Sequence, residues 1–169
     1  MKTPICYFDI KSGVLCPRCQ EKMRRGEVTE LDFEILKILV RLEESGKFPE
    51  LKNITYHRAY REDNIVVILI SGAENAMRPP WTRIARILSG ELGLKVRLVE
   101  KTNNLRLLVE QIIAPCRLLG INVLWLPDGS EENTVRIPRS DRRRLPASPE
   151  VIQKLIRDIA GISARLIME

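Results

Sequence analysis

Apolar residues that recur every three or four positions predict four amphipathic helices along the chain. The first is expected to begin after Thr29, a good N-cap residue with Asp32 at the capping-box position, and to end near Glu44. The other three are predicted over residues 81–92, 104–114 and 149–160. Gly93 and Gly161 directly follow two of these helices, where glycine typically ends a helix in the left-handed conformation.

Alternating or continuous β-branched runs predict six short strands. Their expected residues are 54–60, 65–70, 95–99, 121–126, 134–137 and 162–168, with turns at 61–64 and 127–130, and with one helical turn each at 71–78 and 140–145. The order helix–strand–strand–helix–helix–strand therefore occurs twice, and Gly93 and Gly161 lie 161 − 93 = 68 positions apart. We interpret the chain as a tandem duplication of one α+β unit; the alternative is a single α+β domain with six strands.

Length and charge limit the size of the domains and the kind of partner. A chain of 169 residues with 44% hydrophobic residues suits one domain or two small ones. The formal net charge of +6 favours a polyanionic partner, most simply a nucleic acid. Aromatic residues make up only 5% of the chain, so base stacking on aromatic rings is not expected to dominate binding. No apolar run approaches the about 18 residues of a membrane span, so no membrane partner is predicted.

The strongest chemical signal is the pattern C-x2-D-x6-C-x2-C, formed by Cys6, Asp9, Cys16 and Cys19. Two ligand pairs of this spacing can surround one metal ion tetrahedrally, and thiolates and carboxylates are ordinary zinc ligands. Pro17 sets the backbone angle of the tight turn that aims the second pair of sulfurs inward. We therefore predict a structural Zn²⁺ in a knuckle over residues 1–27, with Asp9 where a fourth cysteine would be usual.

Three other interpretations of these cysteines stay open, namely a disulfide, a redox dithiol and chance clustering. A disulfide is disfavoured because three clustered cysteines cannot pair evenly, and because no signal peptide precedes them, which also predicts a cytoplasmic protein. A redox role is disfavoured because the C-x-x-C lies outside any strand-to-helix turn. Cys116, far along the chain, is expected to be a small buried residue.

Motifs of catalysis are missing from the sequence. His57 is the only histidine and falls in a predicted strand, where a structural or exposed role is commoner than general-base catalysis. No Gly-rich phosphate loop, nucleophile motif or carboxylate pair at a convincing spacing occurs. We predict a non-enzymatic protein without a small-molecule substrate, in which Tyr56, Tyr60 and Trp125 pack on strands, although exposed ones could stack bases.

Five stretches carry a family resemblance: KSGVLCPRC at 11–19, LGLKVRLVEK at 92–101, LGINV at 119–123, LPDG at 126–129 and DRRRLP at 141–146. With the αββααβ order of the type II KH domain, an RNA-binding fold, they make nearly the whole chain resemble the archaeal NusA-like proteins, which carry paired KH units. The resemblance implies KH-like units at residues 28–102 and 103–169 after the zinc knuckle. It also implies RNA binding and a role in transcription elongation or termination.

The chain departs from this family at its G-x-x-G loops, which clamp the phosphates of bound nucleotides. The matching positions are 79–82 and 147–150, and neither contains a glycine. Prolines remove amide donors there, and Trp81 and Glu150 are expected to block close approach by bulk and by negative charge. Both units therefore resemble degenerate KH domains, and the G-x-x-G contacts are not expected in either.

Basic side chains remain as the predicted contacts to RNA, either mRNA or rRNA. They form three patches: Arg18, Lys22, Arg24 and Arg25 after the knuckle; Arg78, Arg83 and Arg86 around the first loop; and Arg136, Arg139, Arg142, Arg143 and Arg144 before the second. The alternatives are solvated surface charges without a ligand, and a protein-interaction module that docks on RNA polymerase or the ribosome.

Overall fold

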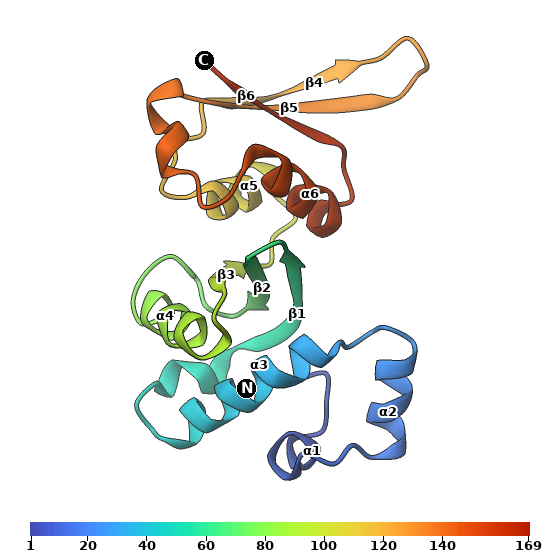
Figure 1. Cartoon of the computed structure of the whole chain (residues 1–169), viewed down its shortest axis with the longest axis vertical. Coiled ribbons are helices and arrows are strands. Elements are labelled where there is room, and N and C mark those ends of the chain that lie inside the picture. The colour runs from blue at the N-terminus through green and yellow to red at the C-terminus, as the bar shows by residue number, and fades with distance from the viewer. The chain divides into compact units, whose positions relative to one another are not determined.

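The structure is a computed structural model that describes all 169 residues and has an α+β fold (Figure 1). Its elements are α1 (Tyr7–Ser12), α2 (Pro17–Arg24), α3 (Glu30–Glu44), the 3-10 helix η1 (Pro49–Asn53), β1 (Thr55–Glu62), β2 (Ile65–Ser71), α4 (Trp81–Leu92), β3 (Lys95–Glu100), α5 (Leu105–Ile113), β4 (Gly120–Trp125), β5 (Glu131–Ile137), the 3-10 helix η2 (Arg139–Arg144), α6 (Pro149–Ala160) and β6 (Ala164–Met168).

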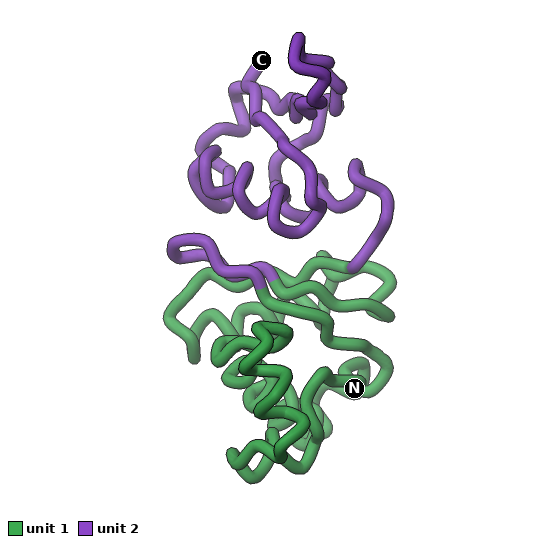
Figure 2. The backbone as a smooth tube through the Cα atoms, turned by 90° about the vertical axis from the view of Figure 1, so that its right-hand side faces the viewer, with its two compact units in different colours: residues 1–59, 68–100 green, residues 60–67, 101–169 purple.

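The chain divides into two compact units (Figure 2). The first comprises residues 1–59 and 68–100, and the second comprises residues 60–67 and 101–169. Three strands form each of two separate sheets, in the orders β1-β2-β3 and β4-β5-β6. No helix is both long and apolar enough to cross a membrane.

The first unit contains α3 and residues 68–71 of the central strand β2, whose residues 65–67 belong to the second unit. The predicted capping box at the start of α3 is confirmed, because Thr29 and Asp32 each accept a hydrogen bond from the other's backbone N–H. One face of α3 is buried through Ile35, Leu36 and Leu39. The six residues of β2 from Ile65 to Ile70 are all buried, as expected of a strand with neighbours on both edges.

The second unit packs α5 and α6 with a mixed sheet. Strand β4 pairs with β5 antiparallel, and β5 pairs with β6 parallel. Along β5, Val135 and Ile137 are buried, whereas the alternate residues Thr134 and Arg136 are partly exposed. The main buried side chains of the two helices are Leu108, Ile112, Ile152, Leu155 and Ile156.

Local signals placed most elements correctly, but two expectations failed. Residues 71–78 do not form a helical turn, because the N–H groups of Gly72 and Ala73 donate to the Glu100 carboxylate instead. The counterpart at 140–145 is helical, as η2. The predicted turn at 61–64 is also shorter, because β1 continues to Glu62. The helices α1, α2 and η1 were not predicted.

Candidate metal centre and basic surfaces

The four predicted ligands lie at the beginnings of two short helices. Cys6 is the N-cap of α1 and Asp9 is its third residue; Cys16 is the N-cap of α2 and Cys19 is its third residue. Side chains at the N-cap and third positions lie on the same end of a helix, which is the relation used in a capping box. The spacing of two residues within each pair therefore brings both ligand atoms to one end of their helix.

The two helix starts are joined by reciprocal hydrogen bonds. The Cys16 N–H donates to Oδ2 of Asp9 at 2.9 Å, and the Cys6 N–H donates to Sγ of Cys19 at 3.4 Å. Each helix thus supplies the acceptor for the N-cap amide of the other helix. This exchange holds the two pairs against each other across the intervening segment, in which Gly13 takes a left-handed conformation with φ +78°.

The geometry of the cluster fits a tetrahedral metal. One ligand atom from each of the four residues lies within 4.8 Å of all the others, and the Sγ atoms of Cys6 and Cys16 are 3.9 Å apart. Metal–sulfur bonds of about 2.3 Å at tetrahedral angles place two sulfurs about 3.8 Å apart. All four cysteines of the chain are free thiols. The site is accessible from one side, because Cys6 is exposed whereas Asp9 and Cys19 are buried.

Charge and burial distinguish the two buried residues of the cluster, Asp9 and Cys19. The N–H of Cys16, which donates to Asp9, is the main cause that lowers the pKa of the Asp9 carboxyl group. Burial is the main cause that raises the pKa of the Cys19 thiol to about 12, and its hydrogen bond with Asp9 adds to the effect. A metal ion would therefore displace the proton of Cys19 next to a carboxylate that is already ionised.

Cys116 lies outside this cluster. It is 7% exposed, and its thiol donates to the backbone carbonyl of Asp141 at 3.3 Å. The expectation that Cys116 is a small buried residue is confirmed. His57 likewise has a local partner, since its Nε2 lies 2.8 Å from the hydroxyl of Ser71 on β2.

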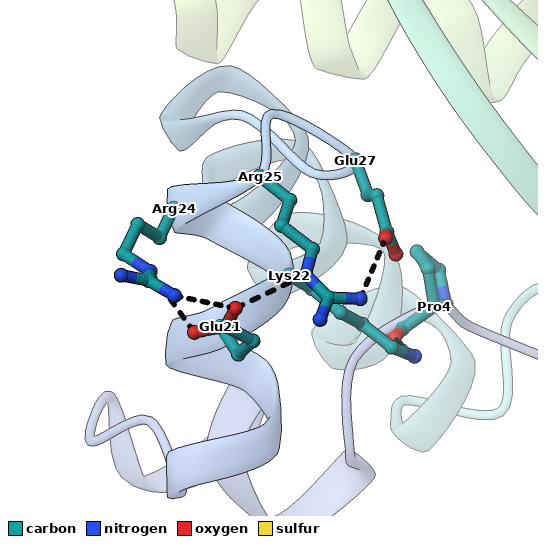
Figure 3. A network of polar contacts seen from close by, with 6 residues as sticks. All are labelled: Pro4, Glu21, Lys22, Arg24, Arg25 and Glu27. Carbon is teal, nitrogen blue, oxygen red and sulfur yellow. Dashed lines mark hydrogen bonds and ion pairs between the residues drawn. The ribbon is translucent and has the colours of Figure 1, made fainter.

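Most of the basic side chains after the knuckle have partners within the chain (Figure 3). Arg24 and Arg25 both contact the Glu21 carboxylate, at 2.7 and 3.0 Å, and Arg25 also approaches Glu27 at 3.9 Å. Lys22 donates to the backbone carbonyl of Pro4 at 2.6 Å. Within this patch, Arg18 alone is both exposed and without an ion pair.

The patch around the first loop is exposed, and one member rests on an aromatic ring. Arg78, Arg83 and Arg86 all lie at the surface, and the Arg83 guanidinium is 5.8 Å from the centre of the Phe48 ring. Trp81, which was expected to block this loop by its bulk, is instead buried at 5% exposure. Because Trp81 begins α4 on its apolar face, it belongs to the core and does not obstruct a ligand.

In the second unit, the buried carboxylate of Asp141 organises the arginine-rich segment. Asp141 accepts hydrogen bonds from the backbone N–H of Arg117 at 2.9 Å and from its Nε at 3.4 Å, and it lies 3.7 Å from Arg144. The donated N–H of Arg117 is the main cause that lowers the pKa of Asp141. Sequence reasoning missed Arg117, because it lies 24 residues away from its partner.

The other arginines of this segment differ in how they are held. Arg136 pairs with Glu169 at 3.4 Å, and Arg139 contacts the backbone at the end of β6. The side chains of Arg142 and Arg143 are exposed and form no ion pair. They lie on η2, just before α6, where the hydroxyl of Ser148 accepts the N–H of Val151 as the predicted N-cap.

Comparisons with known proteins reveal a likeness of fold. No protein-family model and no curated protein matches the chain. A solved structure titled "Crystal structure of APE1850" is similar, with a TM-score of 0.51 and 16% sequence identity. The match covers 79% of this chain and 96% of that chain. At this identity the likeness concerns the fold alone.

Proposed function

We propose that this chain is a non-enzymatic RNA-binding protein with two KH-like units and a zinc knuckle, similar to the archaeal NusA-like proteins. In both halves a helix precedes two strands, and a further helix and strand follow, which supports the proposed duplication. The two three-stranded sheets support it as well. Transcription elongation or termination is the process that the family resemblance suggests.

The observation that carries the proposal is the presence of unpaired arginines on η2. Arg142 and Arg143 project from a segment whose position is held by the buried Asp141. An arginine that is already paired loses that partner when it binds a phosphate, whereas an unpaired guanidinium binds without such a loss. Because the loops at 79–82 and 147–150 have no glycine, we assign RNA binding to this basic surface and not to a backbone clamp.

Zinc is the metal that we propose for the knuckle. Three sulfurs and one carboxylate oxygen, all within 4.8 Å of one another, suit Zn²⁺ better than the oxygen-preferring Mg²⁺ or Ca²⁺. Four protein ligands leave no open position for a substrate, so we assign the ion a structural role. Its task would be to hold α1 and α2 together, since neither of these short helices has an apolar face of any length.

The salt dependence of RNA binding tests the proposal. We compare the double variant Arg142→Ala/Arg143→Ala with the matched variant Arg24→Ala/Arg25→Ala, using a single-stranded RNA of mixed sequence. Both variants remove two positive charges, but only the first removes unpaired ones. In the first variant the slope of log affinity against log salt should become shallower by about 1.4, because each phosphate contact contributes about 0.7 for a single strand.

The matched variant should retain the slope of the unmodified protein. Equal changes in the two variants would contradict the proposal, because net charge alone would then explain the binding. Absence of salt-dependent RNA binding by the unmodified protein would contradict it outright.

A further inference from the structure

Strand β4 is an open edge of its sheet. In the order β4-β5-β6 it has a neighbour on one side only. Natural proteins usually protect such an edge with charged residues, with proline or with a covering segment. The six residues of β4, GINVLW, contain neither a charge nor a proline. Figure 1 shows the β4–β5 hairpin extending beyond α5 and α6, so these helices do not cover its tip.

The hydrogen bonds of the hairpin turn determine which backbone groups face outward. Leu126 N–H donates to the Ser130 carbonyl at 2.9 Å, and Gly129 N–H donates to the Leu126 carbonyl at 2.9 Å. Gly129 has φ +85°, which closes this turn. Since bonded and non-bonded pairs alternate along an antiparallel ladder, the even-numbered residues of β4 bond to β5. The N–H and C=O groups of Ile121, Val123 and Trp125 therefore point to the open edge.

Exposed apolar side chains near the tip lie on both faces of the sheet, and together they form the apolar surface of the hairpin. Val123 and Leu124 are each 52% exposed, and Trp125 is 68% exposed, so the expectation that Trp125 packs on the strand is wrong. Val123 and Trp125 lie on the same face of the sheet as the buried Val135, because directly paired residues share a face. The apolar face of the core thus continues outward along β4 beyond the part that is buried.

Acidic groups surround this apolar surface. Asp128 lies in the turn, Glu131 is paired with Trp125 in the register, and Glu132 is paired with Leu124. None of these three carboxylates forms an ion pair, although the chain has a net charge of +6. Because β5 is the central strand, these two glutamates lie one strand inward from the open edge, one on each face of the hairpin.

We infer that β4 takes up an extended segment of a partner protein as an additional strand, and that this segment carries lysine or arginine beside apolar residues. The outward backbone groups would bind the segment's main chain, and Val123, Leu124 and Trp125 would contact its apolar side chains. The carboxylates at the tip favour a basic segment and repel the phosphates of RNA. A second copy of β4 would bring no charged side chain to meet them. This interface lies on a different surface from the arginines of η2 and goes beyond the proposed RNA binding.

Two peptides of the length of β4 test this inference with the full chain. One alternates lysine and valine, and the matched control alternates glutamate and valine. The basic peptide should bind at least about ten-fold more tightly, since the carboxylates of Asp128, Glu131 and Glu132 attract its lysines and repel the glutamates of the control across the two strand spacings of about 4.8 Å between β5 and an added strand. In the variant Glu131→Lys/Glu132→Lys the preference should reverse.

Amide hydrogen exchange then distinguishes strand addition from general apolar contact. On binding of the basic peptide, the amides of Ile121, Val123 and Trp125 should exchange at least about ten-fold more slowly, whereas those of Asn122 and Leu124 should change little. The variant Val123→Pro removes an outward N–H without breaking a bond to β5, so it should abolish peptide binding and remain folded. Val123→Ala is the control for the lost side chain and should retain binding at reduced affinity.

Three results would overturn the inference. The first is equal binding of the two peptides, or binding of neither. The second is protection of the odd-numbered amides that appears without peptide and grows with protein concentration, which would assign the edge to a second copy of this chain. The third is a shift in the emission of Trp125 on addition of poly(U) together with protection of the same amides, which would assign the surface to RNA.

Discussion

Replacing the buried carboxylate of Asp32 should destabilise the first unit more than any other single polar change on α3. Asp32 is 1% exposed and accepts four hydrogen bonds. Its Oδ2 binds the N–H and the hydroxyl of Thr29, at 2.9 and 3.1 Å. Its Oδ1 binds the hydroxyl of Tyr56 at 2.5 Å and the N–H of Ala59 at 2.8 Å. One side chain thus caps α3 and joins it to β1.

The magnitude follows from the donors that Asp32→Ala would leave without an acceptor. Two of them, the Tyr56 hydroxyl and the Ala59 N–H, are buried, and each buried donor without a partner costs about 1–3 kcal/mol. Loss of the capping interaction with Thr29 costs about 1 kcal/mol more. We therefore expect Asp32→Ala to lower the free energy of unfolding by about 3–7 kcal/mol, a large part of the about 5–15 kcal/mol typical of a domain. Asp32→Asn should cost less, because the amide keeps one acceptor oxygen.

Urea denaturation followed by the fluorescence of Trp81 measures this difference in the unit that contains Asp32. Trp81 is buried in the first unit, and a Trp125→Phe background removes the signal of the second. Glu34→Ala, an exposed change on the same helix, is the control and should stay within about 0.5 kcal/mol. A loss below about 1 kcal/mol for Asp32→Ala, with an unchanged dependence on urea, would refute the reasoning, because water must then replace Asp32 as the acceptor.

Two further predictions concern the metal centre. Asp9→Asn retains an acceptor for the Cys16 N–H but removes the charged ligand, whereas Asp9→Cys retains a ligand but weakens that acceptor. Competition with a chromophoric zinc chelator should therefore show zinc affinity falling by more than about 100-fold in Asp9→Asn and much less in Asp9→Cys; unchanged affinity in Asp9→Ala would exclude Asp9 as a ligand. In the metal-free protein, folding raises the pKa of Cys19 from 9.0 to about 12. The stabilisation that the protonated Cys19 thiol gives to the folded state is therefore fully present below pH 9, and it is lost as the pH rises to about 12. The difference in urea midpoint between the unmodified metal-free protein and Cys19→Ala should shrink over that range, and a difference that stays constant would contradict the raised pKa.

The predictions that were confirmed rest on interactions between residues close together in the sequence. Thr29 and Asp32 lie within one helical turn, and so do Ser148 and Val151, so their residue types suffice to identify the caps. Gly93 and Gly161 end their helices with φ of +67° and +71°, a conformation in which glycine is favoured without regard to distant contacts. The apolar periodicities were equally local.

The cluster of Cys6, Asp9, Cys16 and Cys19 could be predicted from the sequence for the same reason. The hydrogen bonds between its two halves could not. The spacings C-x2-D and C-x2-C each place two ligands at one helix start, which is a local property. That Asp9 accepts the amide of Cys16, and Cys19 the amide of Cys6, depends on how the two helices meet. The ion pairs of Arg24 and Arg25 with Glu21 are local contacts at i,i+3 and i,i+4, but they follow from the helix α2, which was not predicted.

The sequence by itself determined the order of the longer helices and of the strands after residue 28, the caps of α3, α4 and α6, and the four residues of the cysteine–aspartate cluster, because these depend on neighbours within a few positions. The tertiary structure alone decided the burial and pairing that join distant segments. Asp141 became a buried anchor for Arg117, and Trp125 became exposed at the edge of a sheet. Burial and pairing arise from contacts between segments that are distant in the chain, and residue type alone does not specify those contacts.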